Sequence, residues 1–485
     1  MLRRALLISA VLASALTGCG KEVEDYRPDI DESERQLGAE QHPLLLAEFG
    51  GSYDQPEAAY LRRIGEKLSG AADLSGQCTF TLVNSDVVNA FAVPGCYIYV
   101  TRGLMGIVNS EAELASVLAH ELGHIVADHG ERQQKRSLWR QLGVLAVGFV
   151  TGSEALTRLA GNAAGFFTLR YSRKQEYESD DLGIRYLAAA GYDPHAAADM
   201  LDALGRNEQF VARTRGRDEA KGVPEWARTH PLTENRIQRS RDAAAATGLG
   251  ELPELERPFL REVDGLLYGD DPAQGFVMGR RFAHPVMRIG FDAPEGFTLT
   301  NSPQAILIDG PDGLRGEFGG GAMPAGGLDD YAAAVVQRML HGAQAQAQPG
   351  QSQSAIANGI PVLITPFLVR TQQGDVQLTV AAYDADGGSA YHFVMASEPV
   401  EAAAAALRDL FLSFRRLTPE QAASLKPRQI KVVSARPGDT PQSLAKRMAS
   451  DHPLDHFLML NGRAADQPLR PGEMVKIVTY AGAAP

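Results

Sequence analysis

The sequence predicts a multidomain protein: a mainly α domain with a small β-sheet, then an α+β domain, then a small β-α-α-β module. Length is the first reason, because 485 residues suggest two to four domains at about 100–200 residues each. The second is a change of pattern near residue 250, from helical apolar spacing to short strands between Gly, Pro and Asp turns. We expect the domains over 41–250, 255–420 and 430–480.

Composition and charge exclude one class of partner. The chain is 44% apolar and 22% charged, as in folded globular proteins. Its formal net charge is −12, and no basic tail stands out. Phosphate contacts need clustered Lys and Arg, so we expect no nucleic-acid partner.

The N-terminus has the layout of a secretory signal peptide. "MLRR" supplies positive charge, and Ala5–Leu16 is apolar but shorter than the roughly 20 residues that span a bilayer. We expect a signal peptide over 1–18. Residues 19–40 are polar and charged, which is typical of a tether.

The signal peptide ends in "LTGC", which resembles the bacterial lipobox. That resemblance implies a lipid anchor on Cys19, held stably by two or more acyl chains. Gly20 then favours the outer membrane over the inner one, with the chain on the periplasmic side. The alternative is an ordinary signal peptide with a chance cysteine, although the chain holds only three cysteines.

Two strands are predicted over Cys78–Ser85 and Cys96–Gly103, where β-branched and aromatic residues lie between turn signals. Asn89–Gly95 joins them and suits an edge strand, because Pro94 lacks the donor that a central strand needs. A secreted location permits a disulfide between Cys78 and Cys96. Two unrelated buried thiols are the alternative.

The stretch "VLAHELGHIVADH" lies on a well-signalled helix. Ser110 and Glu113 have the spacing of a capping box, apolar residues follow at helical spacing, and Gly130 is a plausible stop. His120 and His124 therefore project from the same face.

With Glu121 these histidines form H-E-x-x-H: two nitrogen ligands for zinc and a carboxylate that takes a proton from the zinc-bound water. The metal lowers the pKa of that water from about 16 to near 7, and Glu121 later protonates the leaving amine. A chance match on an ordinary helix is the alternative. His129 is rotated about 140° from His124, so we expect it not to reach the same ion.

A catalytic zinc needs a third protein ligand and one open position. "SRKQEYESDDLGI" offers four acidic residues, Glu176, Glu178, Asp180 and Asp181, and spacing alone does not choose among them. Glu176 and Asp180 share a helix face, so one could bind the metal and the other orient a ligand histidine. A solvated acidic face is the alternative.

Four motifs resemble the zinc metallopeptidases of the CAAX prenyl endopeptidase type and, more closely, their soluble periplasmic relatives, the β-barrel assembly-enhancing proteases. The motifs are H-E-L-G-H, S-R-x-x-E-x-E-x-D, "NAFAVPGCYIYVTRGLM" and "RTHPLTENRI", in that family's order within about residues 40–245. Cys96 departs from the pattern, since the family usually has a glycine there.

The resemblance implies a gluzincin-type site with one zinc ion per chain. By this carry-over His120, His124 and Glu176 are the ligands, Glu121 is the base and Asp180 orients a ligand histidine.

The resemblance also implies roles outside the ligand set. Asn89, Ala90 and Phe91 would belong to an edge strand that pairs with the main chain of an extended substrate. His230 would fill the open position as a gate or steady the oxyanion, with loop packing as the alternative. Arg236 would hydrogen-bond the tetrahedral intermediate.

The last segment, Ile430–Tyr480, resembles a LysM module in its P-G-D-T and L-N-G turns, which implies binding to peptidoglycan. Its middle, "SDHPLDHF", is longer than usual, and a capping domain that binds nothing is the alternative. The α+β domain over 255–420 has no cluster that argues chemistry. Within it, His341–Gly359 is low in complexity and predicts a flexible loop.

The predicted fold is thus a mainly α zincin-like metallopeptidase domain with a small β-sheet, an α+β domain and a β-α-α-β LysM-like module. The predicted protein is a lipid-anchored periplasmic zinc metalloendopeptidase acting on misfolded or stalled envelope proteins. The alternative is a latent or non-proteolytic assembly factor, or a chaperone, for outer-membrane proteins.

Overall fold

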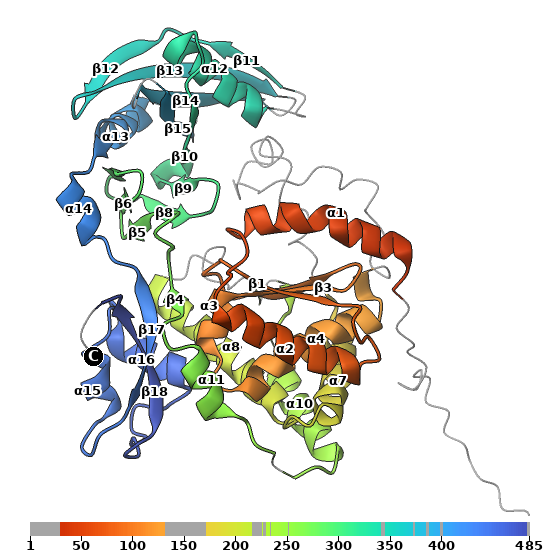
Figure 1. Ribbon diagram of the computed structural model, residues 1–485. Coiled ribbons are helices and arrows are strands. Elements are labelled where there is room, and N and C mark those ends of the chain that lie inside the picture. The colour runs from red at the N-terminus through yellow and green to blue at the C-terminus, as the bar shows by residue number, and fades with distance from the viewer. Residues whose placement is uncertain are drawn as a thin grey trace, which may run out of the picture.

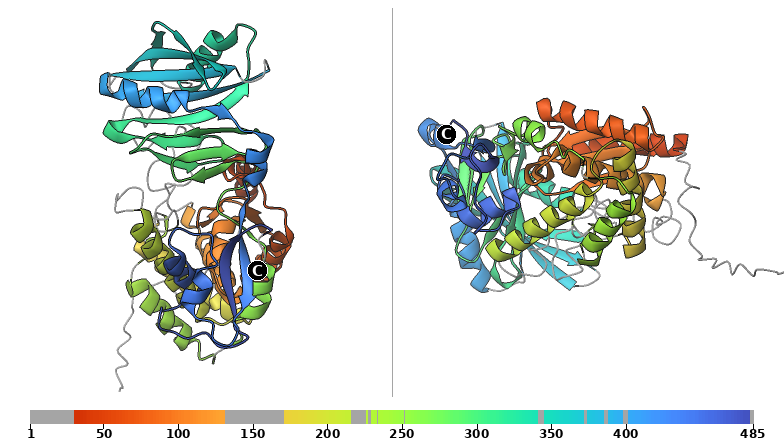
Figure 2. Two further views of the ribbon diagram at one scale, coloured as in Figure 1. Left: turned by 90° about the vertical axis from the view of Figure 1, so that its left-hand side faces the viewer. Right: turned by 90° about the horizontal axis from the view of Figure 1, so that it is seen from below.

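The computed structural model describes residues 30–130, 171–215, 226, 229–232, 234–250, 252–340, 345–371, 374–384, 388–397 and 401–482. The predicted signal peptide, Cys19 and the first part of the tether lie outside them. A helical unit lies below a β-rich unit, and the C-terminal segment lies beside the helical unit (Figures 1 and 2). None of the described helices combines the length and apolarity needed to cross a bilayer.

The helical unit encloses a three-stranded sheet. Its elements are α1 (Glu32–Glu48), α2 (Pro56–Ala71), β1 (Thr79–Val83), β2 (Ala90–Val93), β3 (Tyr97–Thr101), α3 (Arg102–Ile107), α4 (Glu111–Val126), α7 (Arg173–Ala189), α8 (Ala196–Arg215) and α10 (Glu234–Ala246).

In this sheet β3 is central, parallel to β1 and antiparallel to β2, so β2 lies at an edge. Side chains of β3 alternate between its two faces, as a strand requires. Tyr99 packs toward α1 with Leu45 and Phe49, whereas Ile98 and Val100 join the main core with α2 and α4. The sheet is therefore buried on both faces (Figure 1).

Helix α1 replaces most of the described part of the predicted tether. The helix begins at Glu32, because the side chain of Asp31 caps it and accepts a hydrogen bond from the N–H of Glu34 at 2.8 Å. Its first half exposes charged residues, which is why the sequence looks like a linker. Leu45 and Phe49, at 2% and 7% exposure, fix its second half to the sheet.

A disulfide joins Cys78 and Cys96 across the start of β1 and β3. The turn between β2 and β3 places Gly95 and Cys96 at φ of 79° and 60°. A left-handed residue other than glycine costs about 1–2 kcal/mol, which explains why the related pattern has glycine at this turn.

The β-rich unit holds an eight-stranded and a four-stranded sheet. Its strands are β5 (Phe276–Met278), β6 (Arg281–His284), β7 (Ile289–Asp292), β8 (Thr298–Asn301), β9 (Ile306–Asp309), β10 (Arg315–Ala322), β11 (Gln346–Pro349), β12 (Gln353–Ala357), β13 (Ile360–Thr371), β14 (Gly374–Asp384), β15 (Ser389–Ser397) and β16 (Arg415–Arg416). Its helical segments are η2 (Pro311–Gly313), α12 (Gly327–Met339), α13 (Glu401–Leu412) and α14 (Pro419–Ser424).

Two helices cover the larger sheet. Tyr331 and Val335 of α12 belong to one apolar cluster, and Leu410 and Phe411 of α13 belong to another. The loop predicted over His341–Gly359 is wrong in its described part, because β11 and β12 pair with β13 there.

The C-terminal segment has the predicted order of strand, helix, helix and strand. Its elements are β17 (Arg428–Ser434), α15 (Pro441–Ala445), α16 (Pro453–Asn461) and β18 (Met474–Tyr480), preceded far upstream by α11 (Glu256–Glu262) and β4 (Leu267–Tyr268). The sheet order is β18-β17-β4.

This segment packs into the core of the helical unit. Phe457, Leu460 and Ile477 belong to the same apolar cluster as α2 and α4. Phe259 of α11 joins that cluster too, and β4 pairs with β17, so the boundary predicted at 255 lies too early. The ammonium of Lys476 donates to the carbonyls of Gly106 and Val108, just before α4, at 2.9 and 2.6 Å.

Candidate metal centre

Helix α4 positions three of the predicted site residues, and its start follows the sequence signal. The hydroxyl of Ser110 accepts a hydrogen bond from the N–H of Glu113 at 3.0 Å. His120, Glu121 and His124 are 6%, 0% and 2% exposed. The two histidines share a face, and their Nε2 atoms are 3.0 Å apart.

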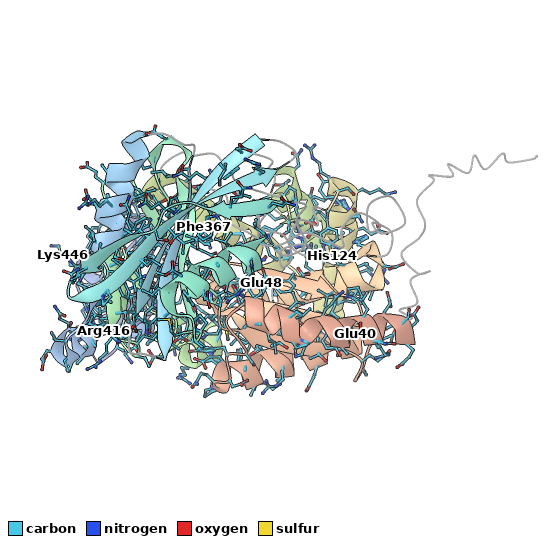
Figure 3. All side chains as sticks on the ribbon, turned by 90° about the horizontal axis from the view of Figure 1, so that it is seen from above. Glu40, Glu48, His124, Phe367, Arg416 and Lys446 are labelled. Carbon is cyan, nitrogen blue, oxygen red and sulfur yellow. A yellow bond between two sulfur atoms is a disulfide. The ribbon has the colours of Figure 1, made fainter. Side chains whose placement is uncertain are left out.

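Four side chains converge on one point: His120, His124, Glu176 and His230. One ligand atom of each lies within 4.8 Å of those of the others, and all four residues are buried. Nδ1 of His230 is 3.4 Å from Nε2 of His120 and 3.0 Å from Oε1 of Glu176. Figure 3 places His124 in the helical unit, away from Phe367 of the β-rich unit. Imidazole nitrogens with a carboxylate are a donor set that suits zinc.

A close approach of α4 and α7 brings Glu176 to the histidines. A Cβ on Gly123 would lie 2.7 Å from both the carbonyl oxygen and the hydroxyl of Ser179. That hydroxyl donates to the carbonyl of His120 at 2.8 Å. The small residue at 123 therefore sets the distance between the two helices that carry the ligands.

Asp180 and Arg236 hold His120 and Glu176 from behind. Oδ1 of Asp180 lies 2.9 Å from Nδ1 of His120, the nitrogen that faces away from the cluster. Arg236 donates to both oxygens of Asp180 at 2.7 and 2.8 Å and pairs with Glu176 at 2.6 Å. Its side chain is 2% exposed and its guanidinium contacts Asp180 and Glu176, and the contact of Arg236 with the tetrahedral intermediate stays a prediction.

The charges of the cluster suit metal binding. Burial raises the pKa of Glu176, but Arg236 and His230 outweigh it and hold that pKa well below the usual range. Burial likewise raises the pKa of Asp180, and Arg236 with His120 lowers it to about 2. Burial lowers the pKa of His124 well below its ordinary value. The acids are therefore ionised and His124 is neutral, as metal ligands must be.

Glu121 supplies the test of whether this set fits a hydrolytic metal. Its carboxylate is fully buried, and neither oxygen has a hydrogen-bond partner among the described residues. Buried carboxylates without such partners are costly, so this one points to a missing polar group such as water. Burial raises the pKa of Glu121, and His230 and His120 oppose the rise. A carboxylate with a raised pKa is suited to exchange a proton.

His230 reaches the cluster from a loop and is held by aromatic rings. Its N–H donates to the carbonyl of Trp226 at 2.7 Å, and the two rings stack with centroids 4.3 Å apart. Tyr171 stacks on His124 at 3.9 Å. Burial lowers the pKa of His230, but Glu176 and Glu121 outweigh it and raise that pKa above its ordinary value.

The edge strand β2 lies beside α4 and carries the predicted substrate contacts. Asn89 is fully buried, and neither its Oδ1 nor its Nδ2 has a hydrogen-bond partner among the described residues. Ala90 is buried, and Phe91 stacks on Tyr99 of β3 with centroids 4.8 Å apart. Since β2 pairs only with β3 within the described sheet, its other edge is open to main-chain pairing.

Sequence reasoning missed two residues of the site. Nδ1 of His129 lies 2.8 Å from Nδ1 of His124, and Nε2 of His129 lies 3.2 Å from Oε2 of Glu178. The helical angle correctly placed His129 away from the donor set. It did not reveal that the other ring nitrogen of His124 points toward His129.

Comparisons with known proteins agree with this geometry. Residues 55–244 match the family model Peptidase family M48. This segment is similar to that family. It is similar to the beta-barrel assembly-enhancing proteases of Yersinia pestis, 28% identical over 265 residues, and of Escherichia coli, 30% identical over 195 residues. It is also similar to the mitochondrial metalloendopeptidase OMA1 of Arabidopsis thaliana, 37% identical over 125 residues.

These alignments cover 50%, 38% and 26% of this chain, respectively, and 53%, 38% and 25% of the relatives. The chain thus spans about half, or less, of the length of the relatives it matches. The matched segment contains the sheet, the helices α4 and α7, and the loop that carries His230. Metallopeptidases of this family use zinc, and the buried cluster can bind such a metal.

Proposed function

We propose that this chain is a gluzincin-type zinc metalloendopeptidase with one zinc ion held by His120, His124 and Glu176. The observation that carries the proposal is the buried Glu121 carboxylate, which has no hydrogen-bond partner among the described residues and lies beside this donor set. Zinc, when bound, would lower the pKa of a water molecule and polarise the substrate carbonyl.

Other side chains would transfer the proton, orient a ligand and bind the substrate. Glu121 takes a proton from the attacking water and gives it to the leaving amine, which is the role of a general base that then acts as an acid. Asp180 accepts the Nδ1–H of His120 and so keeps Nε2 free for the metal. Asn89, Ala90 and Phe91 offer the edge of β2 to the main chain of an extended substrate.

We propose that His230 acts as a gate. Its Nδ1 joins the other three donors within 4.8 Å, so four protein ligands face one point. A catalytic zinc keeps one position open, and with His230 in place no such position remains. The arrangement described here is therefore the latent form, and His230 must leave before a substrate can bind.

The proposed substrates are misfolded or stalled envelope proteins. This follows the names of the bacterial relatives, which are proteases that enhance β-barrel assembly. Lipidation of Cys19 would anchor the chain on the periplasmic side of the outer membrane, in keeping with the lipobox-like "LTGC".

The second candidate is a non-proteolytic assembly factor or chaperone for outer-membrane proteins. The closed donor set favours it, because a metal held by four side chains is typical of a structural site.

Four forms of the chain from Gly20 onward separate these functions: wild type, Glu121→Gln, His230→Ala and the double variant. Each is incubated with an unfolded outer-membrane protein and with casein, and its zinc content is measured. Cleavage that Glu121→Gln abolishes while zinc stays bound supports the peptidase. Cleavage by His230→Ala alone supports the gate. One zinc per chain with no cleavage by any form favours the chaperone.

We also propose that residues 430–480 bind peptidoglycan, as the LysM resemblance implies. Because this segment shares the core of the helical unit, the test uses the chain from Gly20 onward. Failure of this chain to sediment with purified peptidoglycan would remove the glycan proposal and leave the peptidase untouched.

A further inference from the structure

The second ligand histidine, His124, has an unusual outer partner. Its Nε2 faces the donor set, 3.0 Å from Nε2 of His120 and 3.5 Å from Oε1 of Glu176. Its Nδ1 faces the other way, 2.8 Å from Nδ1 of His129. Nε2 of His129 in turn lies 3.2 Å from Oε2 of Glu178. A ligand, a second histidine and a carboxylate therefore form one line.

Metal binding by Nε2 of His124 determines which ring nitrogens of His124 and His129 carry a proton. A ligand nitrogen must offer its lone pair, so Nε2 of His124 carries no proton and Nδ1 carries the single proton of the neutral ring. Nδ1 of His129 must then accept that proton in a hydrogen bond. A neutral His129 consequently carries its own proton on Nε2 and donates it to the carboxylate of Glu178. Each donor therefore has an acceptor: His124 donates to His129, and His129 donates to Glu178.

We propose that His129 and Glu178 are positioning residues that fix the tautomer and ring orientation of His124 as a zinc ligand. This inference rests on the proposed zinc site and extends it. The site then has two separate supports: Asp180 and Arg236 behind His120, and His129 and Glu178 behind His124.

Burial strengthens the argument for His129. The side chains of His124 and His129 are 1% and 0% exposed, and that of Glu178 is 21% exposed. Their hydrogen bonds are thus shielded from water on the histidine side, where a lost partner is costly. Tyr171 stacks on His124 at 3.9 Å and limits its ring to one plane, but it cannot select a tautomer. Within the described residues, His129 is the partner that contacts the nitrogen that must hold the proton.

Loss of an outer partner of a ligand histidine weakens metal binding by about 10–100-fold. His129→Phe fills the ring volume but accepts no hydrogen bond. His129→Asn keeps an acceptor oxygen near the place of Nδ1. Glu178→Ala removes the end of the line. Asp181→Ala is the matched control, because Asp181 lies on the same helix and pairs with Arg239 instead.

The experiment measures the zinc Kd of the full chain from Gly20 onward by competition with a chelator. His124→Ala and thermal melting of each variant are included. We expect His129→Phe to raise Kd tenfold or more, about the lower limit of the effect of a lost outer partner. His129→Asn should recover most of the loss, Glu178→Ala should weaken binding, and Asp181→Ala should not. The downfield Nδ1–H proton of His124 should vanish from the NMR spectrum of zinc-bound His129→Phe.

Wild-type Kd in both His129→Phe and Glu178→Ala, with binding lost in His124→Ala, would overturn the inference and leave the zinc site standing. A loss in His129→Phe that Asn does not recover and Glu178→Ala does not share would mean packing alone, and would overturn it too. If His129→Phe fails to fold, Glu178→Ala decides the question by itself. Equal zinc affinity in wild type and His124→Ala would instead contradict the proposed function.

Discussion

We expect acidic pH to lower the stability of the C-terminal segment, because His456 becomes protonated when this segment unfolds. This residue lies on α16, with Nε2 2.7 Å from the hydroxyl of Tyr268 and Nδ1 3.0 Å from that of Ser450. Its ring stacks on Phe210 of α8 with centroids 5.0 Å apart. Burial, with a smaller contribution from Arg428, lowers the pKa of His456 to about 3.

The sign and size of the effect follow from this pKa. In the unfolded chain the His456 pKa is about 6.5. Below that pH His456 is protonated in the unfolded state, whereas in the folded state it stays neutral until about pH 3. Stability is therefore intact above about pH 6.5 and falls as the pH drops toward about 3. At 1.36 kcal/mol per pKa unit, the loss is about 2 kcal/mol at pH 5 and about 4 kcal/mol at pH 3.

Hydrogen exchange measured by mass spectrometry can follow this locally. We expect the opening free energy of Pro453–Asn461 to fall by about 2 kcal/mol between pH 7.5 and 5.0, after correction for the intrinsic exchange rate. His456→Gln keeps a donor and an acceptor but does not titrate, so most of the fall should disappear. An equal fall in wild type and variant would refute the reasoning, because the acid sensitivity would then come from other groups.

Three further predictions concern the elements that support the metal centre. Gly123→Ala should weaken zinc binding at least tenfold, since the new Cβ would lie 2.7 Å from two atoms of α7 and push the helices apart; this is measured by chelator competition. Replacing both Cys78 and Cys96 by Ala should lower the free energy of unfolding by about 3 kcal/mol, the value for a loop closed over 18 residues, measured by urea denaturation. Deleting residues 426–482 should abolish zinc binding and lower the melting temperature, because the deletion removes part of the core around α4.

Each of these has a control. Gly70→Ala adds a Cβ that would lie 3.5 Å from the hydroxyl of Ser75, so it should leave zinc affinity unchanged; an equal loss there would show that α4–α7 spacing is not the cause. Reductant should destabilise the wild type but not the double cysteine variant, and equal effects on both would argue against the disulfide's role. A shortened chain that binds zinc as tightly as the full one would show that the helical unit folds without its C-terminal neighbour.

Local sequence patterns are sufficient to predict helix α4 and the two histidines that it carries on one face. Ser110 caps α4, and helical spacing alone puts His120 and His124 on one face, because both signals act within a few turns. Glu176 needed the resemblance, since four acidic residues stood in the same stretch. In the structure Glu176 faces the histidines and Asp181 pairs with Arg239, a choice that the packing of α7 makes and spacing does not.

Tertiary pairing decides the features that the sequence did not predict. β11 and β12 are short and rich in Gln, Ser and Ala, so their strand character comes from pairing with β13 and not from propensity. The resemblance implies a contact between Arg236 and the reaction intermediate, and no local pattern predicts the partners that Arg236 has in the structure. In the structure it pairs with two acids on α7, which are 56 and 60 positions earlier in the chain.

Contacts with other parts of the chain also hold helix α4 at both of its ends. Before its start, Lys476 donates to the carbonyls of Gly106 and Val108, across more than 360 positions of sequence. Burial lowers the pKa of Lys476 and raises that of Glu113 in the first turn of α4, because a dry interface disfavours both charged forms. Beyond its end, His129 turns back onto His124. The C-terminal segment thus holds the backbone just before α4, and α7 holds the ligands that α4 carries, which is why changes far from the H-E-x-x-H motif should alter metal binding.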